Sequence, residues 1–153
     1  MNMIDPSMKS RDPTSFIETF GTVRRRFTAL AAQFYATADV GTMQAKLVRH
    51  IAKRSPISQA ELARITESDP TLTSRTLGVL IERGFVRRER SAEDKREYLL
   101  ELTASGKRLC ARLEALRSEF AAQVVGALDD RDLADFDRIA QKILAAADRT
   151  AQR

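Results

Sequence analysis

The sequence predicts a mainly α-helical fold with one small β-hairpin, and three observations support this fold class. Gly and Pro are sparse, at 6 and 4 among 153 residues, and Trp is absent, which suits a helical chain of one domain's length. Apolar residues recur with a helical period over most of the chain. The period changes after Gly84, where two short strand-like segments surround the polar stretch "SAEDKR".

The first expected helix begins at Asp12-Pro13, since Asp caps helices and Pro is tolerated at the first helical position. The preceding residues 1–11 lack the apolar core of a signal peptide and are predicted to be a disordered lead-in. Apolar side chains along this helix follow a seven-residue repeat, which is typical of a seam between helices. The repeat comprises Phe16, Phe20, Val23, Phe27, Leu30 and Phe34.

A helix-turn-helix is expected in the centre of the chain. A second helix should occupy about residues 41–54, and Ser58-Gln59-Ala60-Glu61 has the pattern of a capping box that starts a short third helix. A fourth helix begins at Asp69-Pro70, only four residues after the third, and should end at Gly84. Two short helices with so brief a connection are typical of this motif. Strands are then expected over residues 85–90 and 97–102.

Two further helices with apolar stripes should complete the fold. Thr103 is expected to cap the first of them, and Asp129 to open the second. Together with the first helix they carry more apolar surface than the central motif can cover, so burial against a second copy is the favoured solution. A monomeric helical bundle is the alternative. The predicted dimer interface contains Phe16, Phe20, Val23, Phe120, Val124, Leu133, Phe136 and Ile143.

The start of the fourth helix has the residues that a nucleic acid would require. Free backbone N–H groups and the positive end of the helix dipole favour phosphate there, and Thr71, Thr73, Ser74 and Arg75 lie in the first two turns. Arg75 could donate two hydrogen bonds to guanine. Leu72 faces outward by the helical period, either to contact a thymine methyl group or as a loosely packed surface side chain.

The charged hairpin offers a second contact. An arginine on a thin projecting hairpin can enter a narrow, A·T-rich minor groove, and Arg96 lies at the predicted tip. Asp94 is expected to hydrogen-bond its guanidinium and fix its direction. Arg88 and Arg90 lie on the strand leading in. A solvated turn with an ion pair is the alternative for this stretch alone, but the adjoining helix-turn-helix favours the DNA contact.

These residues resemble the MarR family of winged helix-turn-helix transcriptional regulators. The resemblance covers about residues 14–147 and is densest in "SQAELAR", "TSRTLGVLIERGFV", "DKR" and "LLELTASG". It implies a homodimer that binds a pseudo-palindromic operator in double-stranded DNA, with Arg96 oriented by Asp94. Leu72 and Thr73 depart from the family pattern, which affects base preference. The expected DNA-binding set is Ser58, Gln59, Thr71, Leu72, Thr73, Ser74, Arg75, Arg88, Arg90, Asp94, Lys95 and Arg96.

The expected organisation is therefore a lead-in (1–11), an N-terminal dimerisation helix (12–40), a winged helix-turn-helix lobe (41–103) and C-terminal dimerisation helices (104–150). Many family members bind small aromatic acids between the dimerisation helices and this lobe. Three phenylalanines, a methionine and a histidine could form such a site for an aromatic or phenolic effector. Only the histidine among them would titrate near neutral pH. Ordinary core and interface packing is the favoured interpretation. The set comprises Phe20, Phe27, Phe34, Met43 and His50.

Other functions are less well supported by the sequence. One His and one Cys have no evident partner, and no Gly-rich phosphate loop or metal-ligand spacing is present, so neither an enzyme nor a metal or cofactor site is expected. Cys110 is expected to be a small buried side chain, with redox sensing as the alternative. A winged helix that contacts proteins would not need Arg75 or Arg96.

Composition indicates the cellular compartment of the protein and limits what its net charge can say about DNA binding. A single cysteine, with no apolar run of membrane-spanning length, fits the cytoplasm. The net charge of +5 suits a polyanionic partner, yet residues 55–103 contain eight Lys and Arg against nine Asp and Glu. DNA binding must therefore depend on where the basic side chains lie. Repression is expected over activation, and effector binding would lower operator affinity by changing the spacing of the two recognition helices.

Overall fold

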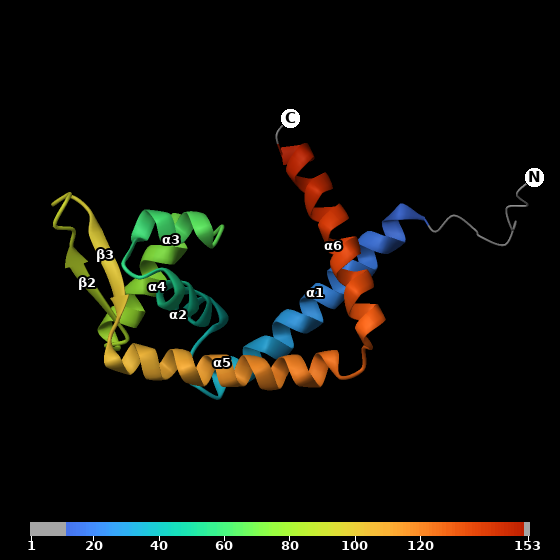
Figure 1. The fold of residues 1–153 in the computed structure, drawn as a ribbon, viewed down its shortest axis with the longest axis horizontal. Helices are drawn as coiled ribbons and strands as arrows, with labels where there is room; N and C mark the ends of the chain where they lie inside the picture. Colours follow the sequence, from blue (N-terminus) through green and yellow to red (C-terminus); the bar gives the residue numbers. More distant parts are fainter. Residues whose placement is uncertain (1–11, 152–153) are drawn as a thin grey trace, which may run out of the picture. The chain divides into compact units, whose positions relative to one another are not determined.

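The computed structural model describes residues 12–151, and the predicted lead-in of residues 1–11 lies outside them. The chain divides into two compact units, with the boundary between Leu116 and Arg117. The described elements follow the order in Figure 1 and confirm the mainly helical fold with a hairpin. They are α1 (Pro13–Ala36), α2 (Thr42–Arg54), β1 (Ile57–Ser58), α3 (Gln59–Ile65), α4 (Pro70–Glu82), β2 (Val86–Arg90), β3 (Tyr98–Leu102), α5 (Ala104–Val125) and α6 (Asp130–Ala151).

Side chains cap the helices of the first unit where the sequence predicts it. Asp12 Oδ1 accepts a hydrogen bond from the Thr14 backbone N–H at 3.0 Å and starts α1. Ser58 Oγ accepts from the Glu61 N–H at 3.2 Å. The second half of the predicted capping box differs, because the Glu61 carboxylate instead receives Arg64 Nη2 at 2.6 Å and Nε at 2.8 Å.

The long C-terminal helices also begin at the predicted caps. Thr103 Oγ1 accepts from the Gly106 N–H at 3.0 Å and starts α5. In the second unit, Asp129 and Asp132 accept from each other's backbone N–H groups at 3.1 and 2.8 Å, which forms a reciprocal capping box before α6. Each bond satisfies an N–H group that has no partner within its helix.

The core of the first unit lies where α2, α3, α4 and α5 meet the sheet. The largest side chains exposed by less than 2% are Leu47, Ile51, Leu62, Leu77, Leu80, Leu100, Leu113, Val48 and Thr73. Burying a leucine of this kind stabilises the fold by roughly 1.5–3 kcal/mol. The inner face of α4 is thereby fixed in the core, and its opposite face is left to solvent.

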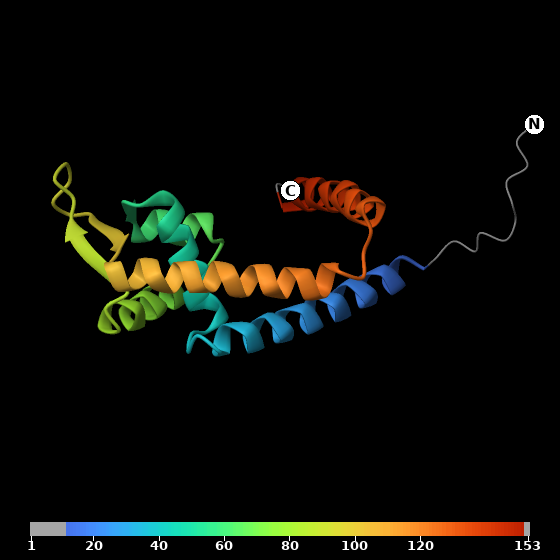
Figure 2. The same ribbon diagram turned by 60° about the horizontal axis from the view of Figure 1, so that its bottom comes forward.

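The hairpin is part of a three-stranded antiparallel sheet with the order β1-β3-β2. Strands β2 and β3 agree with prediction, and the hairpin extends beyond the helices of its unit (Figures 1 and 2). Strand β1 was not predicted, because two residues are too few for an alternating pattern. Its Ile57 is 5% exposed and pairs with Leu100.

The two ends of the hairpin are joined at its base. The Thr103 backbone N–H donates to the Phe85 carbonyl oxygen at 3.1 Å, and the Thr103 hydroxyl donates to the Gly84 carbonyl oxygen at 2.6 Å. Gly84 adopts a left-handed φ of +73°, which favours glycine and ends α4. The residue that caps α5 thus also closes the hairpin.

Apolar side chains on the predicted dimer seam are exposed in the monomer. In α1, Phe16, Phe20 and Val23 are 46–57% exposed, and the rings of Phe16 and Phe20 stack with centroids 6.0 Å apart. In α6, Phe136 is 64% exposed. Phe120 of the predicted set is 8% exposed in the monomer, so it offers less surface to a partner than the exposed members. Val124, Leu133 and Ile143 are half-buried.

No helix among residues 12–151 combines the length and apolarity needed to cross a membrane.

Gly106 should be intolerant of substitution. A Cβ atom there would lie 2.0 Å from the Phe85 carbonyl oxygen, so Gly106→Ala should lower the free energy of unfolding by about 3 kcal/mol or more. Gly78→Ala is the matched control, because no atom lies within 4 Å of its added Cβ and alanine favours helix by about 0.5–1 kcal/mol. Urea unfolding measures both, and equal effects of the two substitutions would contradict the packing argument.

Candidate nucleic-acid interface

The outer face of α4 displays four of the five α4 side chains that are predicted to contact DNA. Asp69 Oδ1 accepts from the Leu72 N–H at 2.9 Å and fixes the start of the helix. Thr71, Ser74 and Arg75 are exposed there, and Leu72 is 46% exposed. The first two turns therefore present one apolar side chain among polar ones, as the helical period predicts.

Thr73 corrects the prediction for this face. Its side chain is 0% exposed, and its hydroxyl donates to the Asp69 carbonyl oxygen at 3.0 Å. The residue therefore belongs to the core of the first unit and cannot offer its side chain to a ligand. The same periodicity that places Leu77 inside also places Thr73 inside, so its inclusion among the exposed contacts was wrong.

The hairpin tip is built around Ser91, which sequence reasoning missed. Ser91 is 7% exposed, and its Oγ accepts from the backbone N–H groups of Glu93 and Asp94 at 3.2 Å each. The Ser91 N–H donates to the Glu97 carbonyl oxygen at 2.9 Å across the turn. A serine at the end of a strand before a charged turn is the signal that could have identified it, since serine hydroxyls commonly organise turns.

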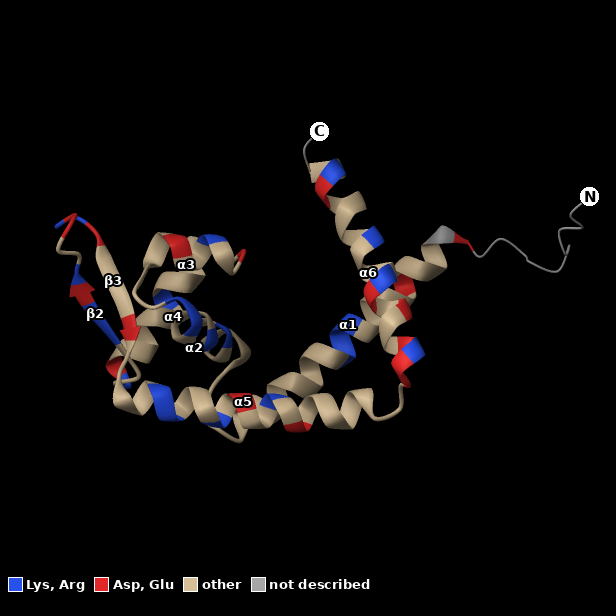
Figure 3. Ribbon diagram, in the orientation of Figure 1, with Lys and Arg blue, Asp and Glu red and all other residues tan. Residues whose placement is uncertain are grey.

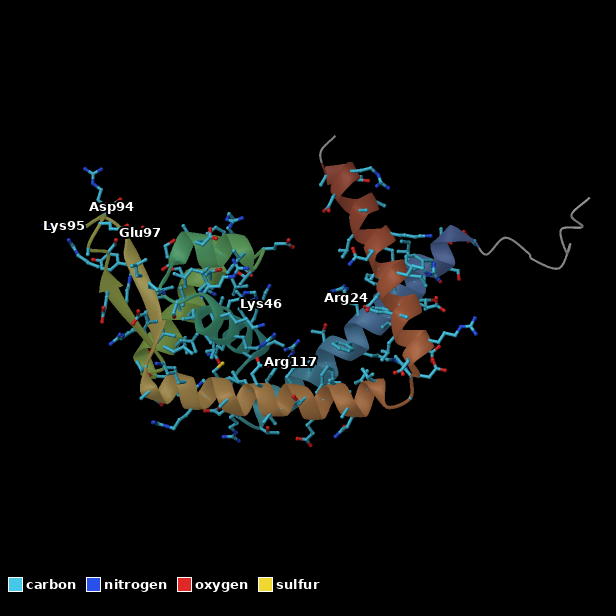
Figure 4. All side chains as sticks on the ribbon, in the orientation of Figure 1. Arg24, Lys46, Asp94, Lys95, Glu97 and Arg117 are labelled. Atoms are coloured by element: carbon cyan, nitrogen blue, oxygen red, sulfur yellow. The ribbon has the colours of Figure 1, made fainter. Side chains whose placement is uncertain are left out.

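Asp94 stabilises the tip in a different way from the one predicted. Its Oδ1 accepts from the backbone N–H of Arg96 at 2.9 Å, where a bond to the guanidinium was expected. This bond fixes the backbone under Arg96 and leaves its side chain exposed. Asp94 lies at the tip with Lys95 and Glu97 (Figure 4).

The two faces of the hairpin differ in charge. On one face Arg87 pairs with Glu101, and its Nε also lies 3.5 Å from Glu89 Oε1. On the other face the guanidinium carbons of Arg88 and Arg90 lie over the Tyr98 ring, 4.3 and 5.5 Å from its centroid.

Tyr98 orders these two arginines without neutralising them. Arg90 Nε also donates to Tyr98 Oη at 3.3 Å. A ring face attracts a guanidinium but, unlike a carboxylate, leaves its charge available to an anion. Sequence reasoning missed Tyr98, although its register opposite Arg90 in an antiparallel pair follows once the turn is placed.

A concave surface brings several predicted residues together. A cavity of about 740 Å³ is bordered by the start of α3, the turn between α3 and α4, and the hairpin. Ser58, Gln59, Arg88 and Arg96 line it, together with Tyr98. The predicted residues that line it therefore come from the junction of β1 and α3 and from the hairpin, all within one unit.

Charged side chains are distributed unevenly over this unit. The net charge of residues 55–103 therefore gave little information about DNA binding. Figure 3 shows Lys and Arg on both α2 and β2. Arg64, Arg88 and Arg96 line the concave surface, while Glu67 and Glu97 lie at the same cavity. The basic groups are thus placed beside the start of α4, whose dipole adds a partial positive charge.

Comparison with known proteins agrees with this geometry. The sequence model of the MarR family matches residues 38–97. The HTH-type transcriptional regulator BilQ of Clostridium symbiosum is 29% identical over 96 residues, which are 63% of this chain and 67% of BilQ. A MarR mutant from Escherichia coli, solved with operator DNA, aligns with a TM-score of 0.77 at 23% identity, over 83% of this chain and 91% of that one. Residues 38–97 thus resemble the MarR family, and the likeness to the solved structure shows that the chain shares its fold.

A second solved structure supports the same fold. MarR of Staphylococcus aureus, in complex with salicylate and kanamycin, aligns with a TM-score of 0.78 at 23% identity, over 88% of this chain and 91% of that one. BilQ is an HTH-type transcriptional regulator, which agrees with the expectation from the sequence that this chain is not an enzyme. The described fold is thus a winged helix-turn-helix, with the hairpin as its wing.

The residues considered for an effector site have mixed environments. Phe20 and Phe27 are 50% and 48% exposed, whereas Phe34, Met43 and His50 are half-buried. Burial, followed by the charges of nearby cationic side chains on α2, lowers the pKa of His50 below its usual 6.5. His50 is therefore neutral at physiological pH.

Cys110 lies elsewhere in the same unit. It is half-buried beside the core and lines a separate cavity of about 500 Å³ with Arg87 and Lys107. Burial raises the pKa of its thiol, which lowers the fraction of reactive thiolate. Among residues 12–151 no cluster of three or more His, Cys, Asp and Glu side chains could hold a metal ion.

Stability should fall on mild acidification because of His50. Its folded-state pKa is depressed by burial and then by Arg49, Lys46, Lys53 and Arg54. The unfolded chain therefore binds this proton more readily, so stability is retained above about pH 6.5 and lost as pH falls toward the folded-state pKa. His50→Gln should flatten the change in urea midpoint between about pH 7.5 and 5.5. An unchanged slope in this variant would assign the effect to other groups.

Proposed function

We propose that this chain is a MarR-family regulator, namely a sequence-specific repressor that binds double-stranded DNA as a homodimer in the cytoplasm. The observation that carries the proposal is the concave surface beside α4, which Arg88 and Arg96 of the wing line together with Ser58, the cap of α3, and Gln59. Its cationic side chains and hydroxyl and amide groups suit phosphate contacts beside a helix that can enter a major groove. The operator complex of the Escherichia coli relative supports the same use of the fold.

Some of the proposed contacts position the protein on the DNA backbone, and others read the base sequence. Ser58, Gln59 and Thr71, with Arg88 and Arg90 held by Tyr98, would bind phosphates and set the register. Arg75 would read guanine from the outer face of α4, and Leu72 would contact a thymine methyl group. Arg96 would enter the minor groove from a tip whose backbone Asp94 fixes, with Lys95 beside it.

The dimer follows from the apolar side chains that the monomer leaves in solvent. Exposed rings on α1 and α6 include Phe16, Phe20 and Phe136, and large exposed apolar surface of this kind marks an interaction site. Two identical subunits would present two recognition helices to half-sites about 34 Å apart. Repression would then result from occupancy of the operator.

We also propose that a small aromatic acid releases the regulator from DNA. The salicylate complex of the Staphylococcus aureus relative supports this ligand class, and the half-exposed rings of Phe20 and Phe27 offer apolar contact surface. Redox control through Cys110 is disfavoured, because burial raises the pKa of that thiol. Use of the winged helix for protein contacts is the alternative that the DNA experiment tests.

Arginine substitutions should separate base reading from general affinity. We expect the protein to bind duplexes from the gene's own upstream region, and fluorescence anisotropy over a salt series measures this binding. The plot of log K against log salt concentration should have a slope of about −0.9 per phosphate neutralised. Arg75→Ala should lose about 1–3 kcal/mol of preference over scrambled duplex. Arg96→Ala should weaken binding and reduce the salt slope by about 1.

Arg138→Ala is the matched control, since Arg138 is an exposed α6 residue paired with Asp135, and its binding should match wild type. Absence of binding by the wild type at low salt would refute the DNA proposal and favour protein contacts. Binding that ignores sequence would indicate an architectural role or a target elsewhere in the genome.

The apolar seam should be sensitive to charge. Phe136 is 64% exposed, so Phe136→Glu should leave the monomer fold intact but weaken dimerisation at least about tenfold, because it would bury an unpaired carboxylate at each of two related positions. Sedimentation equilibrium measures the change. Ala60→Glu, at an exposed α3 position outside the predicted interface, should remain dimeric. A wild-type protein that sediments as a monomer would disprove the dimer.

A further inference from the structure

The connector between α1 and α2 is held from both sides. Its alternate residues Ala38 and Val40 are 7% and 5% exposed and belong to the core. Thr37 and Asp39, which alternate with them along the chain, are exposed, and their backbone carbonyl groups are available to other elements. The connector thus runs across the core in an alternating pattern, although it is not a strand.

Two arginines from different helices bind those carbonyl groups. Arg83, the residue that ends α4, donates from Nη1 to the Asp39 carbonyl oxygen at 2.7 Å. Arg112 of α5 donates to the Thr37 carbonyl oxygen through a short hydrogen bond. The residues that follow α1 are therefore attached both to the end of α4 and to α5.

Several contacts hold the Arg83 guanidinium in place at Asp39. Asp39 has a left-handed φ of 56°, which Asp tolerates better than most residues. The Arg83 guanidinium lies 5.0 Å from the centroid of the Phe85 ring, which restricts it on one side. Its second bond, from Nη2 to Asp39 Oδ2 at 3.0 Å, involves a carboxylate whose side chain is 97% exposed. Solvent weakens such an ion pair, so the backbone carbonyl is the main anchor.

We infer that Arg83 is a positioning residue that couples α1 to the recognition helix α4 and thereby sets the half-site spacing that the dimer accepts. This inference rests on the proposed function, in which α1 contributes to the dimer and α4 enters DNA. A guanidinium fixed to the backbone just after α1 makes the end of α4 follow any displacement of that helix. Without it, each DNA-binding lobe would adjust more freely to its own half-site.

The test varies the distance between half-sites. A duplex selected in vitro by the wild-type protein from a random pool is compared with versions carrying one or two inserted base pairs between the half-sites. One inserted pair shifts a half-site by about 3.4 Å and rotates it, so wild-type affinity should fall at least about tenfold. For Arg83→Gln the fall should be about threefold or less, because lobes that move freely tolerate the shift.

Two controls isolate the contribution of the Asp39 backbone carbonyl group, and a third variant is held in reserve. Asp39→Asn removes the carboxylate but keeps the carbonyl and a residue suited to the left-handed region, so it should retain wild-type spacing selectivity. Arg138→Gln removes an exposed arginine from α6 and should also behave as wild type. Arg83→Lys keeps one donor and replaces Arg83→Gln if thermal unfolding shows that the glutamine variant does not fold.

The possible outcomes distinguish failure of the proposed Arg83 coupling from failure of the proposed dimeric DNA binding. If the wild type prefers one spacing and the Arg83 variant keeps that preference, the coupling role is refuted and the proposed function stands. If the wild type binds one half-site as tightly as two, the dimeric mode of binding is refuted and the inference with it. Relaxed spacing in the Arg83 variant, with unchanged affinity for an isolated half-site, supports the coupling.

Discussion

Burial of the inner face of α4 is the constraint on which the rest of this structure depends. Thr73, Leu77 and Leu80 are at most 1% exposed, and in a helix the positions three and four residues apart share a face. The face opposite is consequently fixed in direction, and it is the one that carries Leu72 and Arg75. A surface for recognition is created here by the packing behind it, at positions that contribute little to the core.

The helical part of the fold could be predicted because each signal is local. Asp12, Asp69 and Thr103 accept hydrogen bonds at the helix starts that the sequence indicated, and Gly84 ends α4 with a left-handed φ. Strand β1 could not be predicted in this way. Two residues have no period of their own, and they are a strand only because Ile57 and Ser58 pair with residues more than forty positions away.

The candidate site was predictable in its composition and less so in its contacts. The outward direction of Leu72 and Arg75 followed from periodicity, and the same rule should have excluded Thr73. The Asp94 contact involved the Arg96 backbone and not its guanidinium, a choice between two nearby donors that sequence spacing does not distinguish. The low exposure of Phe120 was not foreseen, because an apolar stripe does not specify which of its members are exposed in the monomer.

The closure of the hairpin at Thr103 has a consequence for how such proteins diversify. Its two ends are joined by hydrogen bonds from Thr103 to Gly84 and Phe85, so the chain leaves the core and returns to it at nearly the same place. Insertions or deletions between these points need not disturb the packing of the helices, because the cost of closing a longer loop rises slowly with its length. The hairpin is thus an exchangeable module, and another hairpin could be grafted onto this base while the face of α4 that carries Leu72 and Arg75 stays the same.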